Sequence, residues 1–381
     1  MTFLKKKLRI IADENMPKVA ELFSTFGDVT LVDGRSLTNK QVQDADVLLV
    51  RSVTKVNRAL LQDSMVKFVG TATIGVDHID QSYLIDHGID FASAPGCNAN
   101  AVADYVISSL CYLHSNKGVD WLSSEIGVIG FGNVGQVVHS RLKRVGCDLV
   151  VYDPYKREEG DVSFVSLDRV MQCDIICLHA PLTLSGEYPT YHMVNDVMLS
   201  QLSSGASIIS AGRGGVIDEK ALLKRYDELD SQLNLIFDVW EGEPDISRET
   251  LSIVDVATPH IAGYSKQGRE IGTLMIFEAF VKYFNLSVSN NFKDCISKGF
   301  ISSIVCIEDE RNLDVVSKVV NSIYDVMHDD SYMRSVYKGR KQDAKSFDVL
   351  RKNYVERDEF NTCRVNNKNF FTELGFSGRI V

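Results

Sequence analysis

Residues 126–135 read Ile-Gly-Val-Ile-Gly-Phe-Gly-Asn-Val-Gly, and this stretch decides the fold. The pattern G-x-G-x-x-G falls on Gly130, Gly132 and Gly135, after an apolar run and before a helix-like segment over 134–145. In such a turn the first glycine bends tightly, the second admits a pyrophosphate and the third lets a helix pack against a sheet. The N-terminus of that helix then offers backbone N–H groups to the phosphates. The stretch therefore predicts a dinucleotide-binding α/β unit.

An acidic residue follows the next predicted strand, 149–152, and bears on the choice of cofactor. Asp153 lies 18 residues after Gly135. A carboxylate at this position can bind the ribose hydroxyls of a dinucleotide and repel a 2′-phosphate. We therefore expect NAD as the cofactor, although Lys156 and Arg157 close by leave NADP open.

The same alternation of short apolar runs and helix-like segments extends to both sides of the glycine turn. Continuous apolar strands separated by helices are typical of a parallel sheet covered on both faces. Longer helices are expected over 100–114 and 267–284. We predict an α/β fold with two Rossmann-like or flavodoxin-like, doubly wound parallel-sheet domains and a small C-terminal α+β domain. The predicted strands are 8–12, 46–50, 67–72, 89–94, 125–129, 149–152, 175–178, 207–210, 235–239 and 254–257.

Changes in the pattern of apolar and polar residues along the chain predict three domains. We expect a substrate-binding domain over 1–98 that 270–291 completes, an NAD-binding domain over 99–269 and a C-terminal domain over 292–381. The C-terminal domain is predicted to contain strands over 301–308 and 363–365, a helix over 312–326 and a polar loop over 335–347.

Composition excludes several classes of protein. The chain has 381 residues, of which 45% are hydrophobic and 24% charged, so it is globular and longer than one ordinary domain. A net charge of −10 disfavours nucleic acid and anionic membranes as partners. The longest apolar stretch, 101–114, is shorter than the roughly 20 residues of a membrane span. None of the eight cysteines forms a C-x-x-C pair, so we expect no metal site and a cytoplasmic location.

Three segments with chemically useful side chains each follow a predicted strand. In open α/β sheets ligands bind beyond the carboxyl ends of the strands, so these segments can converge. Arg213 offers a planar fork of donors that matches a carboxylate. His260 can take a hydroxyl proton while hydride leaves the same carbon. Glu243 can hold the imidazole in one tautomer and stabilise the imidazolium.

Each of these assignments has a structural alternative. Arg213 could be a surface arginine in a turn, and His260 a histidine whose hydrogen bonds are satisfied within the protein. Glu243 could be an exposed glutamate before a proline, and Glu241 could take its role. Asp238 could bind the nicotinamide carboxamide or simply end a strand.

Four motifs together resemble the D-isomer-specific 2-hydroxyacid dehydrogenases. They are the glycine turn, Arg-Gly-Gly at 213–215, Asp-x-Trp-x-x-Glu-Pro at 238–244 and Thr-Pro-His at 258–260. More narrowly, the chain is similar to a branch of this family that oxidises 4-phospho-D-erythronate to (R)-3-hydroxy-2-oxo-4-phosphooxybutanoate in the synthesis of pyridoxal 5′-phosphate (vitamin B6). The narrower resemblance covers the whole chain, including stretches at 13–17, 50–56, 70–73, 94–99, 260–264 and 347–357.

The resemblance implies an NAD-dependent oxidoreductase that acts on a CH–OH group and dimerises through its C-terminal domain. It implies that Arg213 and Glu243 are active-site residues and that His260 is the acid/base. Ser52, Thr73 and Tyr264 would contact the phosphorylated 2-hydroxy acid. The contacts to NAD would come from Gly130, Gly132, Asn133, Val134, Gly135, Asp153, Ala180, Ala211, Gly212, Asp238 and Gly263. Ala180 stands where a threonine is expected, so a hydroxyl contact to NAD is lost there.

A substrate with a carboxylate and a phosphate carries a charge of about −3, so an acidic chain must concentrate positive charge at its site. We expect Arg213 at the carboxylate and Arg51 with Lys55 near the phosphate. We further hypothesise that Arg351 or Lys352 reaches in from the partner subunit. The alternatives are a dehydrogenase for 3-phosphoglycerate or for an unphosphorylated 2-hydroxy acid, and a non-catalytic NAD-binding regulator.

Overall fold

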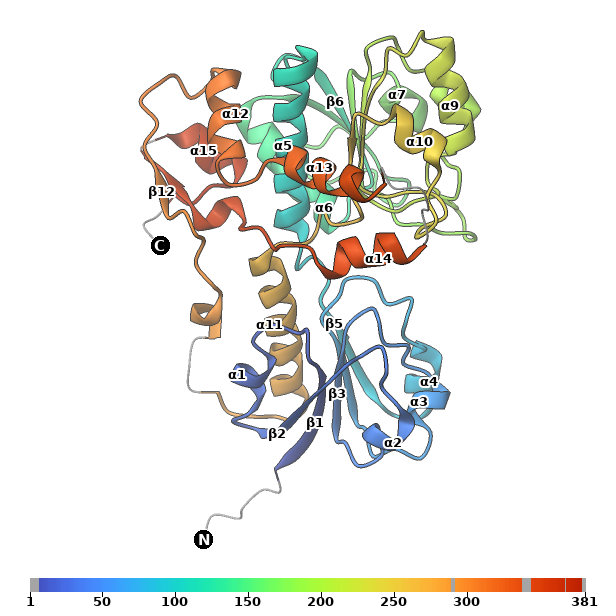
Figure 1. The fold of residues 1–381 in the computed structure, drawn as a ribbon, viewed down its shortest axis with the longest axis vertical. Coiled ribbons are helices and arrows are strands. Elements are labelled where there is room, and N and C mark those ends of the chain that lie inside the picture. The colour runs from blue at the N-terminus through green and yellow to red at the C-terminus, as the bar shows by residue number, and fades with distance from the viewer. Residues whose placement is uncertain (1–6, 289–291, 338–343, 367, 379–381) are drawn as a thin grey trace. The chain divides into compact units, whose positions relative to one another are not determined.

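The structure is a computed structural model that describes residues 7–288, 292–337, 344–366 and 368–378. The chain forms two compact units (Figure 1). The first combines Met1–Asn98 with Ser265–Ser297, and the second combines Ala99–Tyr264 with Lys298–Val381. No helix among the described residues is long and apolar enough to cross a membrane.

The first unit is built on a five-stranded parallel sheet in the order β2-β1-β3-β4-β5. Its strands are β1 (Leu8–Asp13), β2 (Gly27–Val32), β3 (Val47–Val50), β4 (Phe68–Thr71) and β5 (Asp90–Ser93). Its short helices are α1 (Val19–Phe23), α2 (Asn39–Val42), α3 (Arg58–Leu61) and α4 (Gln81–Asp86). The long helix α11 (Lys266–Tyr283) packs on β4 and β5, where Phe277 and Phe280 meet Phe23 in the core. The segment that contains α11 thus belongs to the first unit.

Strand β2 is absent from the sequence prediction, which sought continuous apolar runs. Among the described residues it pairs only with β1, at the edge of the sheet. Gly27 and Val29 alternate with exposed residues such as Asp28 and Thr30. An edge strand with one face toward water needs no continuous apolar run, which is why the expected signal is missing.

The second unit is built on a six-stranded parallel sheet in the order β11-β10-β9-β8-β6-β7. Its strands are β6 (Glu125–Ile129), β7 (Asp148–Tyr152), β8 (Ile175–Leu178), β9 (Ser207–Ser210), β10 (Asn234–Phe237) and β11 (Val256–Ala257). Its helices before α11 are α5 (Ala99–Lys117), α6 (Asn133–Val145), α7 (Leu167–Val170), α8 (Asp196–Leu199), α9 (Glu219–Glu228) and α10 (Arg248–Ile253). The chain leaves β6 toward β7 on one side and β8 lies on the other side. The carboxyl ends of β6 and β8 therefore form the switch point where such sheets bind ligands.

The C-terminal segment is part of the second unit. Its elements are β12 (Ser303–Ile304), α12 (Leu313–Asn321), α13 (Val326–Tyr337), α14 (Ala344–Lys352), β13 (Arg364–Val365) and α15 (Asn369–Leu374). Helix α12 lies beside α5, and α15 beside α6 (Figure 1). Buried side chains of both helices, among them Val316 and Phe371, share one core with α5.

A buried ion pair stabilises the helices beneath this segment. Arg141 Nη1 lies 2.5 Å from Asp104 Oδ1, and Asp104 Oδ2 accepts the backbone N–H of Phe360 at 3.0 Å. Burial raises the pKa of the Asp104 carboxyl, and the Arg141 guanidinium opposes that shift. Removing either partner would leave an uncompensated buried charge, which is strongly destabilising.

The predicted α/β fold class with a small C-terminal domain is confirmed, but details of the last segment differ. The loop expected over 335–347 is wrong at both ends, because α13 continues to Tyr337 and α14 begins at Ala344. Its centre, 338–343, lies outside the described residues. The helix expected over 312–326 ends at Asn321, and the strand expected over 301–308 is reduced to Ser303–Ile304. The predicted boundaries at 269 and 292 stay predictions, since residues 298–381 group here with 99–264.

The polar sequence of the last helices explains the wrong loop. In α14 the apolar residues Phe347 and Leu350 are fully buried, whereas Asp348 and Lys352 are exposed. Two buried positions three residues apart are enough to fix a short helix on an existing core, although they give a weak periodic signal.

Candidate active site

The glycine turn after β6 has the geometry that its motif predicts. Gly130 has φ 89°, and a Cβ there would lie 2.9 Å from the backbone N of Ala180. A Cβ on Gly135 would lie 2.0 Å from the carbonyl oxygen of Gly130. A Cβ on Gly132 would meet no protein atom within 4 Å. The backbone of the turn therefore contacts neighbouring protein atoms at its first and third glycines. At the second glycine no protein atom is close, and a pyrophosphate would approach there.

Helix α6 begins directly after this open glycine. Gly132 is its N-cap and offers no side-chain acceptor to the first turn, which starts with Asn133 and Val134. Unsatisfied N–H groups at a helix N-terminus form an anion site. Asp153, after β7, accepts the backbone N–H of Phe131 at 2.9 Å and that of Tyr155 at 3.0 Å. Its carboxylate is thereby fixed beside the glycine turn, with lone pairs left for ribose hydroxyls.

Ala180 and the segment 211–215 face the same switch point. Ala180 is buried, and its carbonyl oxygen would lie 2.6 Å from a Cβ on Gly212. A Cβ on Gly214 would lie 1.8 Å from the carbonyl oxygen of Trp240. Ala211 donates its N–H to the carbonyl of Leu178 at 3.1 Å. The glycines around Arg213 are thus required by backbone packing, which accounts for the glycine-rich turn.

The side chain of Arg213 extends from this turn and makes few hydrogen bonds to the protein. Its Nη1 donates to the carbonyl of Gly212 at 2.9 Å. Within the described part of the chain no carboxylate pairs with it. The guanidinium is half-buried and available for a carboxylate ligand.

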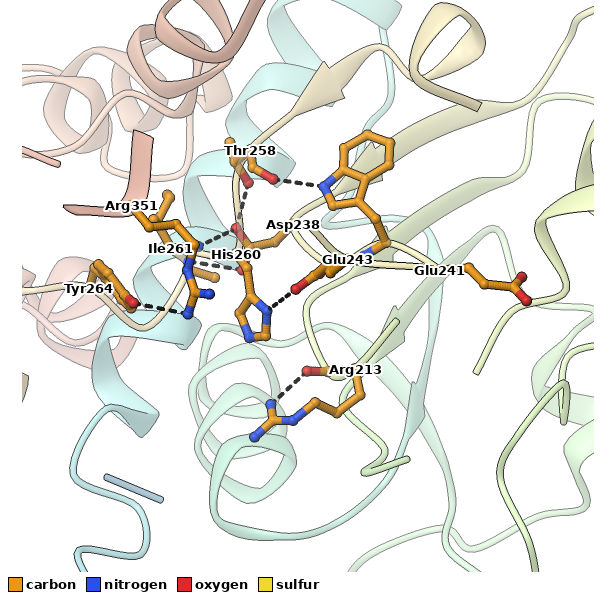
Figure 2. A network of polar contacts seen from close by, with 12 residues as sticks. Arg213, Asp238, Glu241, Glu243, Thr258, His260, Ile261, Tyr264 and Arg351 are labelled. Carbon is orange, nitrogen blue, oxygen red and sulfur yellow. Dashed lines mark hydrogen bonds and ion pairs between the residues drawn. The ribbon is translucent and has the colours of Figure 1, made fainter. Parts of the chain in front are cut away.

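His260 and Glu243 come together after β11 and β10 (Figure 2). Nδ1 of His260 lies 2.7 Å from Oε2 of Glu243, and Oε1 of Glu243 accepts the N–H of Trp240 at 2.8 Å. The N–H of His260 donates to the carbonyl of Asp238 at 2.7 Å, and His260 has φ 56°. With Nδ1 held by the carboxylate, Nε2 is the nitrogen left to exchange a proton.

The ambiguity between Glu241 and Glu243 is resolved by their contacts. Glu241 Oε1 lies 2.8 Å from Nε2 of His192, and Figure 2 shows its side chain turned away from His260. His192, Asp218 and Glu241 lie close enough to hold a metal ion, but all three are half-buried and paired with one another. Glu243 is therefore the residue that can act on His260.

Asp238 anchors the loop that carries His260. One oxygen of its buried carboxylate accepts hydrogen bonds from the hydroxyl of Thr258 at 2.6 Å and from the backbone N–H of Ile261 at 2.7 Å. The other oxygen accepts a hydrogen bond from the backbone N–H of Ala262 at 2.9 Å. Three bonds from one loop favour the strand-end role that the sequence left open. A contact from Asp238 to the nicotinamide stays a prediction, as does one from Gly263, which lies in the turn after Ala262.

Two arginines of the C-terminal segment reach the same loop, and sequence reasoning gave only one of them a role. Arg351 Nη2 donates to Oη of Tyr264 at 3.0 Å within one chain, whereas the hypothesis placed Arg351 in the partner's site. The buried guanidinium of Arg357 donates to the carbonyls of Ile261, Ala262 and Tyr264 at 2.5–3.2 Å. No local motif marks Arg357, because its partners lie more than ninety residues away in the sequence.

The predicted substrate residues Ser52 and Thr73 lie in the first unit. Ser52 follows β3 and Thr73 follows β4, two neighbouring parallel strands in which Val50 is in register with Thr71. Thr73 Oγ1 donates to the carbonyl of Gly75 at 3.0 Å and lies 2.8 Å from Thr71 Oγ1, while Ser52 is exposed. Both hydroxyls therefore stand at the carboxyl edge of their sheet, where ligands bind in such folds.

Known proteins resemble this chain over nearly its whole length. It is 53% identical to the erythronate-4-phosphate dehydrogenase of Marinomonas sp. (strain MWYL1) over 377 residues, which cover 97% of this chain and 99% of that protein. The chain belongs to the erythronate-4-phosphate dehydrogenase family. Its identity to the member from Cellvibrio japonicus (strain Ueda107) is 41%, again over 97% of this chain. The resemblance predicted from the sequence is thereby confirmed.

Two family descriptions match separate parts of this erythronate-4-phosphate dehydrogenase family member. Residues 111–262 match the NAD binding domain of the D-isomer specific 2-hydroxyacid dehydrogenases, which supports the prediction of NAD as the cofactor. Residues 302–375 match a domain of unknown function, DUF3410. The C-terminal segment with Arg351 and Arg357 is thus distinct from the part common to 2-hydroxyacid dehydrogenases.

Solved structures share the dehydrogenase fold. The NAD-bound 3-phosphoglycerate dehydrogenase of Entamoeba histolytica aligns with a TM-score of 0.61 at 23% identity, covering 73% of this chain and 97% of that one. The D-lactate dehydrogenase of Aquifex aeolicus, complexed with NAD and lactic acid, aligns with a TM-score of 0.56 at 24% identity over 73% of this chain. In both alignments about a quarter of this chain has no counterpart.

Proposed function

We propose that this chain oxidises 4-phospho-D-erythronate to (R)-3-hydroxy-2-oxo-4-phosphooxybutanoate with NAD, as a step in the synthesis of pyridoxal 5′-phosphate. Membership of the erythronate-4-phosphate dehydrogenase family supports the substrate. The observation that carries the chemistry is the 2.7 Å contact between Glu243 and Nδ1 of His260, which leaves Nε2 for the substrate.

The residues of the second unit divide the reaction between them. His260 Nε2 takes the proton of the C2 hydroxyl while hydride leaves the same carbon, so a carbonyl forms at C2. Glu243 stabilises the imidazolium that results. Arg213 holds the substrate carboxylate through two parallel N–H···O bonds and keeps C2 in place. When bound, NAD accepts the hydride on its nicotinamide ring.

The residues around the glycine turn fit a dinucleotide. The open face of Gly132 and the uncapped start of α6 suit a pyrophosphate, and the carboxylate of Asp153 suits the ribose hydroxyls. Nζ of Lys156 forms an ion pair with Oε2 of Glu159 at 2.5 Å and lies over the ring of Phe131. A lysine held in this way is less available for the 2′-phosphate of NADP, so NAD is the proposed cofactor.

The proposed substrate contacts are the hydroxyl groups that the family resemblance implies. Ser52 and Thr73 offer hydroxyls at the edge of the first sheet, and Tyr264 offers a phenol on the loop that carries His260. Hydroxyl donors at these places suit the hydroxyl and phosphate oxygens of a phosphorylated sugar acid.

Turnover by the purified protein tests this proposal. The substrates are 4-phospho-D-erythronate, 3-phosphoglycerate and unphosphorylated erythronate, each with a 2-oxo acid supplied as acceptor. We expect selective turnover of 4-phospho-D-erythronate that His260→Ala abolishes. His192→Ala is the matched control, because His192 is also paired with a glutamate but lies on another loop.

The other outcomes of this experiment distinguish the alternative substrates and the alternative of a non-catalytic protein. Preferred turnover of 3-phosphoglycerate would keep the chemistry and overturn the substrate. Binding of NAD without turnover of any of the three would overturn the enzymatic proposal in favour of a non-catalytic NAD-binding regulator.

We also propose that the protein is a cytoplasmic homodimer that associates through its C-terminal segment. Near β12, large apolar side chains are strongly exposed in the single chain: Phe300 at 97%, Val305 at 74% and Ile307 at 89%. They flank β12, a strand at the edge of a two-stranded sheet. Such an apolar edge suits contact with a second copy. All eight cysteines are free, which suits a reducing compartment.

Light scattering on the purified protein tests the dimer. We expect the mass of two chains, and a shift toward one chain in the double variant Phe300→Ser, Ile307→Ser. The mass of one chain for the unaltered protein at micromolar concentration would contradict the proposal.

A further inference from the structure

Arg351 is a cation without a matching anion at the catalytic loop. Its Nη2 donates to Oη of Tyr264 at 3.0 Å, and its guanidinium stands 5.8 Å from the centre of that ring (Figure 2). Its Nε is buried and has no hydrogen-bond partner. Among the described residues no carboxylate forms an ion pair with it. Arg351 as a whole is half-buried, and a guanidinium held partly out of water costs free energy unless an anion and hydrogen-bond acceptors compensate it.

The two carboxylates that favour the charge of Arg351 are already engaged. Burial works against the charge of Arg351, while Tyr264, Glu243 and Asp238 raise its pKa. Glu243 is hydrogen-bonded to His260 and Trp240, and Asp238 to three groups of its own loop. Apart from the hydroxyl of Tyr264, the described residues therefore offer Arg351 no carboxylate that is free to accept its hydrogen bonds, and the guanidinium stays charged.

The helix that carries Arg351 is firmly anchored to the second unit. Phe347 and Leu350, on the same helix α14, are fully buried in the core that contains Phe237 and Trp240. These two residues lie four and one positions before Arg351. The arginine therefore extends from a packed element toward Tyr264 rather than from a mobile surface, as a binding residue should.

Other cations of this region cannot take the same role. Arg357 also has a buried Nε without a partner, but both of its terminal nitrogens donate to backbone carbonyls of the loop and of α5, and its guanidinium lies 3.9 Å from the ring centre of Tyr324. Lys352 is exposed. Arg213 lies on the glycine-rich turn after β9, where it suits the carboxylate beside the reacting carbon. An anionic group remote from that carbon is what Arg351 can bind.

We propose that Arg351, together with the hydroxyl of Tyr264, binds the phosphate of the substrate within the same chain and so selects phosphorylated 2-hydroxy acids. This inference rests on the proposed function, and it deepens it by assigning the phosphate to the C-terminal segment. A phosphate accepts several charge-assisted hydrogen bonds, and the fork of an arginine matches two of its oxygens. The segment that matches a domain of unknown function thereby gains a role in specificity.

Kinetics of Arg351→Ala and Arg351→Lys on two substrates tests this assignment. We expect kcat/KM for 4-phospho-D-erythronate to fall roughly 10- to 100-fold in Arg351→Ala, as for the loss of a hydrogen bond to a charged group. The same variant should change kcat/KM for unphosphorylated erythronate less than about threefold. Arg351→Lys should recover part of the loss, because it keeps the charge but not the fork.

Two controls separate binding from folding. Lys318→Ala removes an exposed cation from α12 of the same segment and should leave both substrates unaffected. Circular dichroism and NAD binding should be unchanged in every variant. If Arg351→Ala does not fold, Arg351→Gln keeps most of the volume of the side chain and takes its place.

Binding of inorganic phosphate gives a readout that does not depend on turnover. We expect phosphate to inhibit the unaltered enzyme competitively and to bind at least tenfold more weakly to Arg351→Ala in calorimetry. Equal losses on phosphorylated and unphosphorylated substrates, or unchanged phosphate binding, would overturn the assignment. If the unaltered protein prefers 3-phosphoglycerate and Arg351→Ala loses that activity, the proposed substrate fails while the phosphate assignment stands.

Discussion

Oε2 of Glu243 lies 2.7 Å from Nδ1 of His260, while Glu241, two residues earlier, pairs with His192 instead. The neutral imidazole is thereby held with its proton on Nδ1 and its basic lone pair on Nε2. In the proposed reaction the same carboxylate would stabilise the imidazolium formed when Nε2 takes a proton. Because the two glutamates contact different histidines, substituting each in turn gives a pair of matched variants.

Glu243→Gln should lower kcat at least 100-fold, because an amide holds the imidazole without stabilising its charge. Glu241→Gln is the control and should stay within about threefold of the unaltered enzyme. Equal losses in the two variants would contradict the assignment.

Gly132→Ala and Gly135→Ala should separate cofactor binding from folding. A Cβ on Gly132 meets no protein atom, so we expect the free energy of unfolding to change by less than about 1 kcal/mol. Binding of NAD should weaken at least tenfold, because the methyl group occupies the approach of the pyrophosphate.

Gly135→Ala is the contrasting variant. Its Cβ would lie 2.0 Å from the carbonyl oxygen of Gly130, so the helix must move away from the sheet. We expect a loss of about 3 kcal/mol in the free energy of unfolding, measured with urea and circular dichroism. Equal stability of the two variants would contradict this geometry.

Arg357 should act as a positioning residue for the catalytic loop. It holds the carbonyls of Ile261, Ala262 and Tyr264 together with that of Ala101. Although burial disfavours its charge, Tyr324 and other neighbours raise the pKa of the guanidinium, so it stays protonated. Arg357→Met should destabilise the protein by about 3 kcal/mol, because the buried carbonyls lose their donors.

Activity distinguishes positioning from mere stability in this variant. Well below its melting temperature, Arg357→Met should lose kcat on phosphorylated and unphosphorylated substrates alike, whereas Arg351→Ala should lose activity on the phosphorylated substrate. Arg357→Lys should restore part of kcat. An unchanged kcat in a destabilised Arg357→Met would show that the contact is structural only.

His179 should make the stability of the protein depend on pH. Burial lowers the pKa of this histidine to about 4. An unfolded chain takes up the proton near pH 6.5, so the stabilising effect of the neutral imidazole is present above that pH and is lost as the pH falls toward 4. Between pH 7 and pH 5 the unaltered protein should lose about 2 kcal/mol relative to His179→Gln. Parallel pH dependences in urea unfolding would contradict this.

Much of the scaffold can be predicted from the sequence because its signals are local. Buried parallel strands need continuous apolar runs, and β8 and β9 lie at the positions predicted for them. The φ of 89° at Gly130 and the close approach at Gly135 demand glycine, so the dinucleotide turn is visible as a motif. The edge strand β2 is missed for the converse reason, because one of its faces meets water.

The sequence by itself determined the α/β fold, the position of the nucleotide turn and the strand ends that carry Arg213 and His260, since each depends on neighbours within a few residues. Only the tertiary structure decided that Glu243 rather than Glu241 faces His260. Tertiary structure alone also brought Arg351 to Tyr264, 87 residues away in the chain. Such contacts depend on how helices pack on a distant core, as Phe347 and Leu350 do here, and no local pattern encodes that packing.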